Sequence, residues 1–442
     1  MSSIAPSRTL IVGSGGREHA LAWKLASEPG GNEVIAAPGS DAIAREPRVR
    51  CAPVDPLDPA GVVALARREA VELVVIGPEG PLAAGVGDAL TAAGIPVFGP
   101  TRAAARIESS KAFCHEVTGA AGVRMARAGA FSDPGAALGF AADLAARGGG
   151  LVVKADGLAS GKGVTVCDTL EEAVRAIDAL RITNAAATVV IEERLAGREA
   201  SLIALCDGRE AVALPPARDH KRLLDGDAGP NTGGMGAYSP IDDLPDDQAE
   251  LLLDAFHRPI LAELARRGTP FRGALYAGLM LTVDGPVLLE CNARFGDPET
   301  QATLPRLAVA LGPFLLAAAR GDLGSAIAGF HLAVRRLPTL PGAAVAIVLA
   351  AAGYPGQPRG GDPISGLQEA ATDALVFHAG TAIDPDGTVR TAGGRVLAVV
   401  GRGPDLAAAR AFATSAADRI QAPGLQRRHD VGLDLVATGA GR

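Results

Sequence analysis

Leu288-Leu-Glu-Cys-Asn-Ala-Arg-Phe-Gly-Asp-Pro-Glu299 is the stretch that says most about the fold and chemistry of this chain. Its apolar start continues a run from Val287 and predicts a β-strand, which forms a hairpin with Tyr276 to Val283 over Asp284-Gly285. On a strand Glu290 and Asn292 point to the same face, and Arg294 follows where the strand ends. A carboxylate and an amide oxygen suit Mg²⁺, which takes about one or two protein ligands and otherwise binds water and phosphate oxygens. The stretch predicts a metal site beside a cation for anionic oxygens, although Glu-x-Asn alone is more often an edge strand ending in a polar turn.

The length and composition are those of an ordinary globular protein. With 442 residues, 48% of them hydrophobic and 21% charged, we expect about two to four domains that each bury a core. The net charge of -7 and the 3% of aromatic residues argue against a general nucleic-acid binder or a membrane-surface binder. Small anionic ligands would therefore need local pockets lined by cations.

The cysteines and the apolar runs indicate where the protein acts. The cysteines include no C-x-x-C pair, so neither a disulfide framework nor a zinc site is expected. They are scattered at Cys51, Cys114, Cys167, Cys206 and Cys291. No apolar run reaches the roughly 18 residues of a membrane span, and the N-terminal strand meets Gly13 in place of a signal-peptide core. We expect a cytoplasmic monomer without membrane or nucleic-acid partners.

The N-terminal region alternates strands with helices. A strand over Thr9 to Val12 runs into the glycine turn Gly13-Ser-Gly-Gly-Arg-Glu-His19 and then a helix, and such a turn presents backbone N–H groups to an anion. The dinucleotide fingerprint would need glycine where this chain has Glu18, so NAD binding is weakly supported. Further strands over Glu33 to Ala36 and Leu73 to Ile76 predict a parallel sheet that binds ligands at its C-terminal strand ends.

A second glycine-rich loop joins two predicted strands, Leu151 to Lys154 and Val164 to Cys167. A Walker A loop would need glycine in place of Asp156 and Ser or Thr in place of Gly163, and it would lead into a helix. The loop is therefore predicted to be a flexible hairpin that carries Lys162 and is suited to fold over phosphates. An ordinary mobile hairpin is an equally good interpretation of the pattern alone.

Three later segments carry charged or flexible residues. The strand over Thr188 to Ile191 runs into Glu192-Glu-Arg-Leu195, which could offer its backbone to an adenine edge while Glu199 accepts hydrogen bonds from ribose hydroxyls; a solvated loop is the alternative. One helix is expected to carry Lys111, by default on a solvated surface. The glycine-rich stretch Gly229 to Pro240 follows the basic segment Arg218 to Arg222, and its glycines suggest close approach to a ligand or a closing loop.

These segments are similar to those of the phosphoribosylamine–glycine ligase family. The stretches that carry the resemblance are Gly13 to Ala20, Lys154 to Val164, Asp219 to Arg222, Gly229 to Pro240 and Leu289 to Gln301. The resemblance spans nearly the whole chain and implies an α/β protein with an α+β ATP-grasp core. It implies a Rossmann-like N-terminal domain over residues 1–106, an ATP-grasp domain over 107–336 with a nucleotide lid at about 124–196, and a small mixed C-terminal domain over 337–442.

The resemblance further implies a ligase of purine biosynthesis that joins glycine to 5-phosphoribosylamine through glycyl phosphate, using ATP with Mg²⁺ or Mn²⁺. The residues it assigns to ATP are Lys111, Lys154, Gly157, Ser160, Gly161, Lys162, Gly163, Glu192, Glu193, Arg194, Leu195 and Glu199. Those it assigns to the other substrates are Gly15, Gly16, Arg17, Glu18, Gly39, Asp219, Lys221, Arg294, Asp297, Pro298, Gly393, Gly394 and Arg395. Catalytic roles fall to Arg294, Lys154 and Asp219, and the metal ligands are Glu290 and Asn292.

The chain departs from the family pattern at two places. The strand before Glu290, Gly278 to Leu281, lacks the acidic metal ligand of many ATP-grasp enzymes, and the usual Pro-Gly-Asn-x-Gly is Pro38-Gly-Ser-Asp-Ala42. A free amine needs no histidine base, so structural roles are expected for His115 and His378. The alternatives to the ligase are another ATP-grasp carboxylate ligase and a non-catalytic nucleotide sensor.

Overall fold

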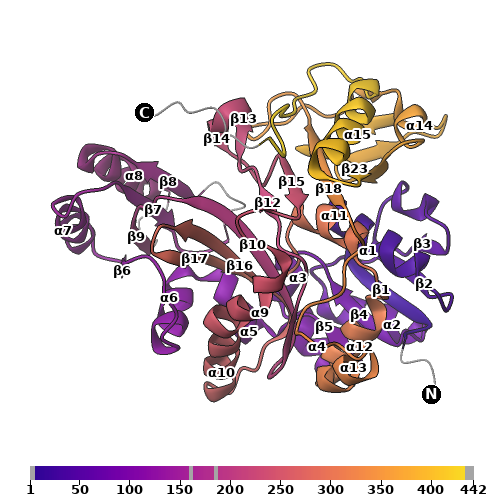
Figure 1. The fold of residues 1–442 in the computed structure, drawn as a ribbon, viewed down its shortest axis with the longest axis horizontal. Coiled ribbons are helices and arrows are strands. Elements are labelled where there is room, and N and C mark those ends of the chain that lie inside the picture. The colour runs from indigo at the N-terminus through magenta and orange to yellow at the C-terminus, as the bar shows by residue number, and fades with distance from the viewer. Residues whose placement is uncertain (1–4, 159–162, 184–187, 434–442) are drawn as a thin grey trace.

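The computed structural model describes residues 5–158, 163–183 and 188–433. Figure 1 shows the N-terminal parallel sheet at the lower right, the C-terminal strands at the upper right and a separate sheet with α7 and α8 at the left. A central antiparallel sheet lies between them. No helix in the described residues is long and apolar enough to cross a membrane.

The N-terminal sheet is parallel, as predicted, with the order β3-β2-β1-β4-β5. Its strands are β1 (Arg8–Gly13), β2 (Glu33–Pro38), β3 (Val49–Cys51), β4 (Leu73–Ile76) and β5 (Val97–Phe98). Its helices are α1 (Gly16–Ser27), α2 (Pro59–Arg68), α3 (Glu79–Ala84) and α4 (Val86–Ala92), with a 3-10 turn at Ile43–Arg45. The short strand β3 was not predicted, because three residues are too few to show a period.

The predicted helix around Lys111 is wrong in one respect, because two helices meet there. These are α5 (Arg102–Ser109) and α6 (Lys111–Ala120), and Ser110 between them is extended, with φ -139° and ψ 113°. The Ser110 hydroxyl accepts a hydrogen bond from the Phe113 backbone N–H, which caps α6. The Asp156 carboxylate accepts from the Lys111 backbone N–H at 2.6 Å. The break therefore places Lys111 at the start of a helix that faces the glycine loop.

The sheet at the left of Figure 1 has its own core. Its order is β6-β9-β7-β8, formed by β6 (Ala128–Phe131), β7 (Leu151–Ala155), β8 (Val164–Cys167) and β9 (Val189–Glu193). Helices α7 (Pro134–Ala145) and α8 (Leu170–Thr183) pack on it through buried side chains such as Ala141 and Ile177. β7 and β8 are antiparallel, which confirms the predicted hairpin. Lys154 lies near the end of β7, where the hairpin turns toward the central sheet.

The central sheet carries the stretch that opened the sequence. Its order is β11-β10-β16-β17, formed by β10 (Arg198–Asp207), β11 (Ala211–Ala213), β16 (Arg272–Thr282) and β17 (Gly285–Asn292). β16 and β17 form the predicted hairpin, with one irregularity between Gly278 and Leu279, opposite Glu290. A Cβ on Gly278 would lie 3.1 Å from the Glu290 Cγ. On the strand that lacks the acidic metal ligand of many ATP-grasp enzymes, a side chain at position 278 would therefore crowd Glu290.

The helical segment between β15 and β16 is divided. It consists of a 3-10 turn (Asp246–Gln248), α9 (Ala249–Leu252), a π-helical turn (Leu253–His257) and α10 (Arg258–Arg266). Further short helices follow the central sheet: α11 (Glu299–Thr303), a 3-10 turn (Leu304–Arg306), α12 (Gly312–Arg320) and α13 (Leu323–Gly329). Buried leucines of α12 pack beneath the central and N-terminal sheets, so these two sheets share a core.

The C-terminal sheet draws strands from two parts of the chain. Its order is β12-β15-β18-β23-β20, formed by β12 (Arg218–Asp219), β15 (Gly236–Ser239), β18 (Ala343–Ala350), β20 (Leu375–His378) and β23 (Arg395–Gly403). α15 (Leu406–Arg419) packs on it, and α14 (Leu367–Ala370) contacts α15 and β20. β19 (Pro363–Ile364), β22 (Val389–Thr391) and β21 (Thr381–Ile383) form a separate small sheet in that order. β13 (Arg222–Leu224) and β14 (Ala228–Asn231) form a separate hairpin around a 3-10 turn (Asp225–Asp227). Because β15 pairs with β18, the C-terminal strands hold the basic segment that contains Lys221.

One glycine in the N-terminal sheet has no room for a side chain. Gly39 has φ +65°, and a Cβ there would lie 2.4 Å from the Cys51 sulfur. We expect Gly39→Ala to destabilise the fold by about 2–3 kcal/mol, from strain and overpacking together. Gly94→Ala is the matched control, because Gly94 has φ +72° with nothing within 4 Å of its Cβ position. Calorimetry should show a larger fall in Tm for Gly39→Ala; equal falls would contradict the crowding.

Candidate active site

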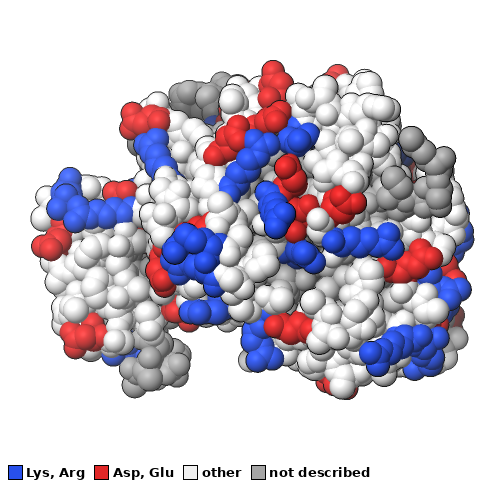
Figure 2. All heavy atoms as spheres, turned by 90° about the horizontal axis from the view of Figure 1, so that it is seen from below, with Lys and Arg blue, Asp and Glu red and all other residues white. Residues whose placement is uncertain are grey.

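A cavity of about 1400 Å³ lies where β7, β17, β12 and the start of the C-terminal strands meet. Its walls come from the other three main sheets and from α1 and α3 beside the N-terminal sheet, so no single domain forms it. Basic and acidic side chains are intermixed on the face of the molecule seen in Figure 2, with no broad field of one sign. Lys111, Lys154, Lys221 and Arg294 all line the cavity, and its described lining holds as many carboxyl side chains as basic ones. An anionic ligand would therefore meet individual cations there, with no broad positive field.

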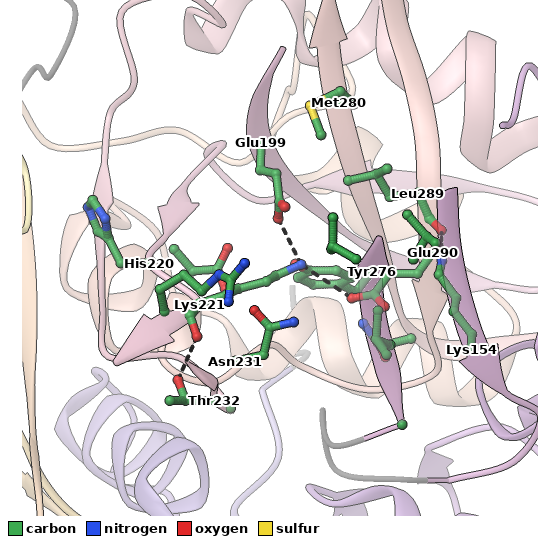
Figure 3. A pocket seen from close by; sticks show the side chains of 18 of the residues that line it. Lys154, Glu199, His220, Lys221, Asn231, Thr232, Tyr276, Met280, Leu289 and Glu290 are labelled. Atoms are coloured by element: carbon green, nitrogen blue, oxygen red, sulfur yellow. Dashed lines mark hydrogen bonds and ion pairs between the residues drawn. The ribbon is translucent and has the colours of Figure 1, made fainter. Parts of the chain in front are cut away.

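The predicted metal ligands lie at one end of β17 and line the cavity. Lys221 reaches between two carboxylates there, with its Nζ 2.9 Å from Glu199 and 3.6 Å from Glu290 (Figure 3). The positive charge of Lys221 is the main reason why the pKa of Glu290 is lowered to about 2, so this carboxylate stays ionised. Burial alone would lower the pKa of Lys221, but Glu199, Glu290 and Asp219 outweigh it and raise the pKa well above 10.5.

The donor set of Glu290 and Asn292 fits a hard divalent cation. Glu290 offers an ionised carboxylate, and the Asn292 amide lines the same cavity. Among the described residues no cluster of three or more His, Cys, Asp or Glu side chains could hold a metal ion. Two oxygen ligands with room for water and phosphate oxygens match what Mg²⁺ prefers, whereas a zinc site would need more protein ligands.

Asp219 lies beside this group, and its pKa is shifted in the opposite direction to that of Glu290. Burial is the largest influence on its carboxyl group and raises its pKa, and Glu299, Glu199 and Glu290 act in the same direction. Lys221 opposes them, yet the pKa of Asp219 stays well above its ordinary value. A raised pKa favours the protonated form of a carboxyl group, which can donate a hydrogen bond as well as accept one. Asp219 differs in this respect from Glu290, whose pKa is lowered.

Lys154 is held from two sides at the end of β7. Its Nζ lies 2.7 Å from the Glu192 carboxylate and 3.4 Å from the Leu289 carbonyl oxygen. The other Glu192 oxygen lies 2.9 Å from His115 Nε2. Because Glu192 is almost fully buried, its carboxylate serves these two partners and does not face the cavity freely. Lys111 lies close by and donates from Nζ to the Gly157 carbonyl at 2.9 Å.

The arginines of the cavity are paired with carboxylates. Arg294 lies 3.0 Å from Glu108 and 3.4 Å from Glu79. Arg17 contacts Glu79 as well, at 3.3 Å, and donates to the Phe295 carbonyl. Arg395 lies 3.3 Å from Asp297 and donates to the Gly233 carbonyl. These pairs hold the guanidinium groups in fixed positions around one end of the cavity.

Comparison with known proteins identifies the family. Residues 7–108, 109–300 and 344–434 match the N domain, the ATP-grasp (A) domain and the C domain of phosphoribosylglycinamide synthetase. A phosphoribosylamine–glycine ligase of Ralstonia nicotianae is 45% identical over 430 residues, which cover 96% of this chain and 98% of that protein. The chain belongs to the phosphoribosylamine–glycine ligase family.

Other relatives agree with this assignment. A phosphoribosylamine–glycine ligase of Streptomyces coelicolor is 48% identical over 96% of this chain and 98% of that protein. The crystal structure of the Thermotoga maritima ligase has a TM-score of 0.78 and 34% identity, covering 96% of this chain and 99% of that one. A biotin carboxylase domain from Hydrogenobacter thermophilus has a TM-score of 0.67 at 17% identity, which shows the shared ATP-grasp fold alone.

The structure brings most of the residues expected for the ligase family to this cavity. Those that line it are Arg17, Lys111, Lys154, Gly163, Glu192, Glu193, Arg194, Leu195, Glu199, Asp219, Lys221, Glu290, Asn292, Arg294, Asp297, Gly394 and Arg395. Ser160, Gly161 and Lys162 lie outside the described residues. Glu193 accepts from the Arg127 backbone N–H, and Arg194 pairs with Asp168, so both side chains already have partners within the ligase fold.

Seven of the residues expected for the ligase family do not line the cavity: Gly15, Gly16, Glu18, Gly39, Gly157, Pro298 and Gly393. Glu18 is buried and accepts from the Gly15 backbone N–H at 2.5 Å, which caps α1. A Cβ on Gly16 would lie 2.8 Å from Gln301 Nε2, so this glycine allows α1 to pack on α11. Gly157 contributes its carbonyl oxygen to Lys111. These contacts are structural, and contacts of the seven residues with substrate stay a prediction.

Several residues that line the cavity were not predicted as site residues from the sequence. Met280 and Leu289 form part of the apolar wall, and Met280 is paired with Glu199 in the strand register. Tyr276 lines the floor, where its hydroxyl lies 2.8 Å from Ser201. His115 lines the cavity as well, although a structural role was expected for it. Met280 lies opposite Glu199 in the pairing of β16 with β10, so a predicted strand pairing could have indicated that it lines the cavity. No local sequence pattern points to His115.

Proposed function

We propose that this chain joins glycine to 5-phosphoribosylamine with ATP, through glycyl phosphate, to give glycinamide ribonucleotide, ADP and phosphate in purine biosynthesis. The observation that carries the proposal is the convergence of Glu290, Asn292, Lys154, Lys221 and Arg294 on one cavity. Membership of the ligase family supports the choice of substrates. A glycine carboxylate oxygen attacks the γ-phosphorus, and the amine of phosphoribosylamine then attacks the acyl carbon and displaces phosphate.

The proposed nucleotide end of the cavity draws residues from β7, β9, β10, β16 and β17 and from the start of α6. Lys154 and Lys111 bring positive charge for phosphate oxygens, and Glu199 is placed to accept from ribose hydroxyls. Met280 and Leu289 provide an apolar surface for the adenine ring. Glu192 supports this end indirectly, because its carboxylate holds Lys154 in place. ATP-grasp enzymes use ATP with a divalent metal, and we propose Mg²⁺ or Mn²⁺ on Glu290 and Asn292, where it would stabilise charge on the transferred phosphoryl group.

The acceptor end contains groups suited to glycine and to phosphoribosylamine. Arg294, Arg17 and Arg395 lie around it, each fixed by a carboxylate. A guanidinium fork binds carboxylate or phosphate oxygens at two points, which orients an anionic substrate. Asp219 lines the cavity beside Lys221, and its carboxyl group can hydrogen-bond to the amine. The reaction then depends on positioning and electrostatics, with no nucleophilic side chain.

The test is an omission experiment that measures ADP with Mg²⁺, ATP, glycine and freshly made phosphoribosylamine. ADP should form at the full rate only when all four components are present. If ADP formation is indifferent to glycine but requires another carboxylic acid, the chain is a different ATP-grasp ligase. If ATP binds without any turnover, the nucleotide-sensor alternative replaces the ligase.

Two expectations on the protein in the cell belong to the same proposal. We propose that it acts in the cytoplasm, where purine precursors are made, and that it acts as a monomer, because the cavity is formed within one chain. Sedimentation equilibrium at assay concentrations tests the second point. A stable dimer whose dissociation abolishes turnover would contradict it. The division into domains at about residues 106 and 336 also stays a proposal, and β15–β18 pairing indicates that the last two parts fold together.

A further inference from the structure

The segment from Arg428 to Asp430, here called the clasp, is hydrogen-bonded to the loop that joins β13 to β14. Arg428 is the largest fully buried side chain among the described residues. Its guanidinium donates to Asp227 at 2.5 Å and to both carboxylate oxygens of Asp430, at 2.7 and 2.6 Å. Asp227 belongs to the hairpin, whereas Asp430 belongs to the clasp. One buried cation therefore joins the two segments.

Further bonds run in both directions between the clasp and the hairpin. Asp430 accepts from the Gly226 backbone N–H at 2.8 Å. Asp225 accepts from the His429 backbone N–H at 2.7 Å, and its other oxygen lies 3.0 Å from His429 Nδ1. The two segments are about 200 residues apart in sequence, so these bonds are made only when the chain is folded. Together they fix the loop by backbone and side-chain bonds at once.

The hairpin held in this way forms part of the cavity wall. Arg222, Asp227 and Asn231 line the cavity, and so does Leu433, just beyond the clasp. The strand start at Arg222 directly follows Lys221, the residue that lies between Glu199 and Glu290. Thr232, at the end of the hairpin, donates to the Lys221 carbonyl at 2.9 Å (Figure 3). Movement of the hairpin would therefore move Lys221.

His220 offers a second connection between the clasp and the site. It is buried, and its Nδ1 lies 4.0 Å from Asp227. Its Nε2 is buried and has no hydrogen-bond partner within the described parts of the chain. Asp227 thus stands between Arg428 on one side and the segment His220-Lys221 on the other.

We propose that Arg428 is a positioning residue of the active site, which acts through Asp227 to hold the hairpin and Lys221 in place for the acceptor substrate. The link to substrate rests on the proposed function, whereas the link to the hairpin does not. Asp430 is buried, so loss of the Arg428 cation would leave its carboxylate without a charged partner, whereas loss of Asp227 leaves the Arg428–Asp430 pair in place. The clasp thus supports the hairpin in the cavity wall, and Leu433 just beyond it lines the cavity itself.

The experiment uses two variants of the full chain, Asp227→Asn and Arg428→Met, and one control. Asp227→Asn is the decisive variant, because the Asp227 side chain is 59% exposed and the Arg428–Asp430 pair is left intact. The control is Asp384→Asn, which weakens another carboxylate–arginine pair, with Arg390, away from the cavity. Hydrogen exchange followed by mass spectrometry reports on residues 222–231 without any ligand, and steady-state kinetics reports KM for each substrate.

In Asp227→Asn, we expect exchange in residues 222–231 to rise about tenfold as a charge-assisted bond is weakened. We expect KM for phosphoribosylamine to rise by a similar factor, with KM for ATP and the Tm unchanged. Arg428→Met, which removes the cation itself, should raise exchange in the same residues at least as much. Asp384→Asn should leave all four quantities unchanged. Unchanged exchange in Asp227→Asn would overturn the clasp itself, whatever the enzyme does. Raised exchange with unchanged KM for phosphoribosylamine would overturn its role in positioning, while the proposed function would stand.

Discussion

Glu290→Ala should lower kcat by about a thousandfold, which corresponds to roughly 4 kcal/mol of transition-state stabilisation. The side chain is one of the two proposed metal ligands that β17 presents to the cavity, and its pKa of about 2 means that it is ionised throughout the working pH range. Removal of one of the two proposed ligands should also raise the Mg²⁺ concentration needed for half-maximal rate. ADP release measured over a Mg²⁺ titration gives both quantities.

Two comparisons make this prediction specific. Glu210→Ala removes a carboxylate paired with Arg335 outside the cavity and should leave kcat and the Mg²⁺ requirement unchanged. Electron paramagnetic resonance can measure the affinity for Mn²⁺ in the presence of ADP. This affinity should fall in Glu290→Ala and stay unchanged in Glu210→Ala. A Glu290→Ala protein that binds Mn²⁺ normally would show that Glu290 is not a metal ligand.

Lys154→Met should lower kcat/KM for ATP by about a hundredfold, or roughly 2.7 kcal/mol. The ammonium group is placed at the nucleotide end of the cavity by the Glu192 carboxylate and the Leu289 carbonyl. Its loss should also destabilise the fold by about 2–3 kcal/mol, because Glu192 is left buried with His115 as its remaining partner. Kinetics and calorimetry on the same preparation separate the two effects.

The double variant Lys154→Met/Glu192→Gln distinguishes lost chemistry from lost stability. With the buried carboxylate neutralised, most of the Tm of the wild-type protein should return. The rate should not return, because the cavity still lacks the cation that contacts phosphate oxygens. Recovery of the rate together with the Tm would show that Lys154 acts only by balancing Glu192.

Much of the local structure followed from the sequence. Apolar alternation and turn residues predicted β4, the β7–β8 hairpin and the β16–β17 hairpin, and the last of these places Glu290 and Asn292 at the cavity. Such patterns are local: a buried face needs apolar residues at a fixed period, and a turn needs glycine. The break at Ser110 was not predicted, because a good capping residue inside a helical pattern looks like any other serine.

The charge pairs of the site could not be predicted in the same way. Sequence indicated Lys221, Arg294 and Glu192 as ligands for substrates, whereas each one also has a protein partner that fixes its position. Those partners come from distant strands and helices, such as Glu108 for Arg294. A charge gives no periodic signal, so its partner is known only once the sheets are packed.

The sequence by itself indicated the family, many of the strands and helices, and the residues proposed to carry the metal and phosphate chemistry. The tertiary structure alone decided which of these residues meet: Lys221 between Glu199 and Glu290, and Arg428 between Asp227 and Asp430. The physical reason is range. Periodic burial and turn geometry act over a few neighbouring residues, whereas contacts between charges depend on the packing of sheets whose strands are far apart in the chain.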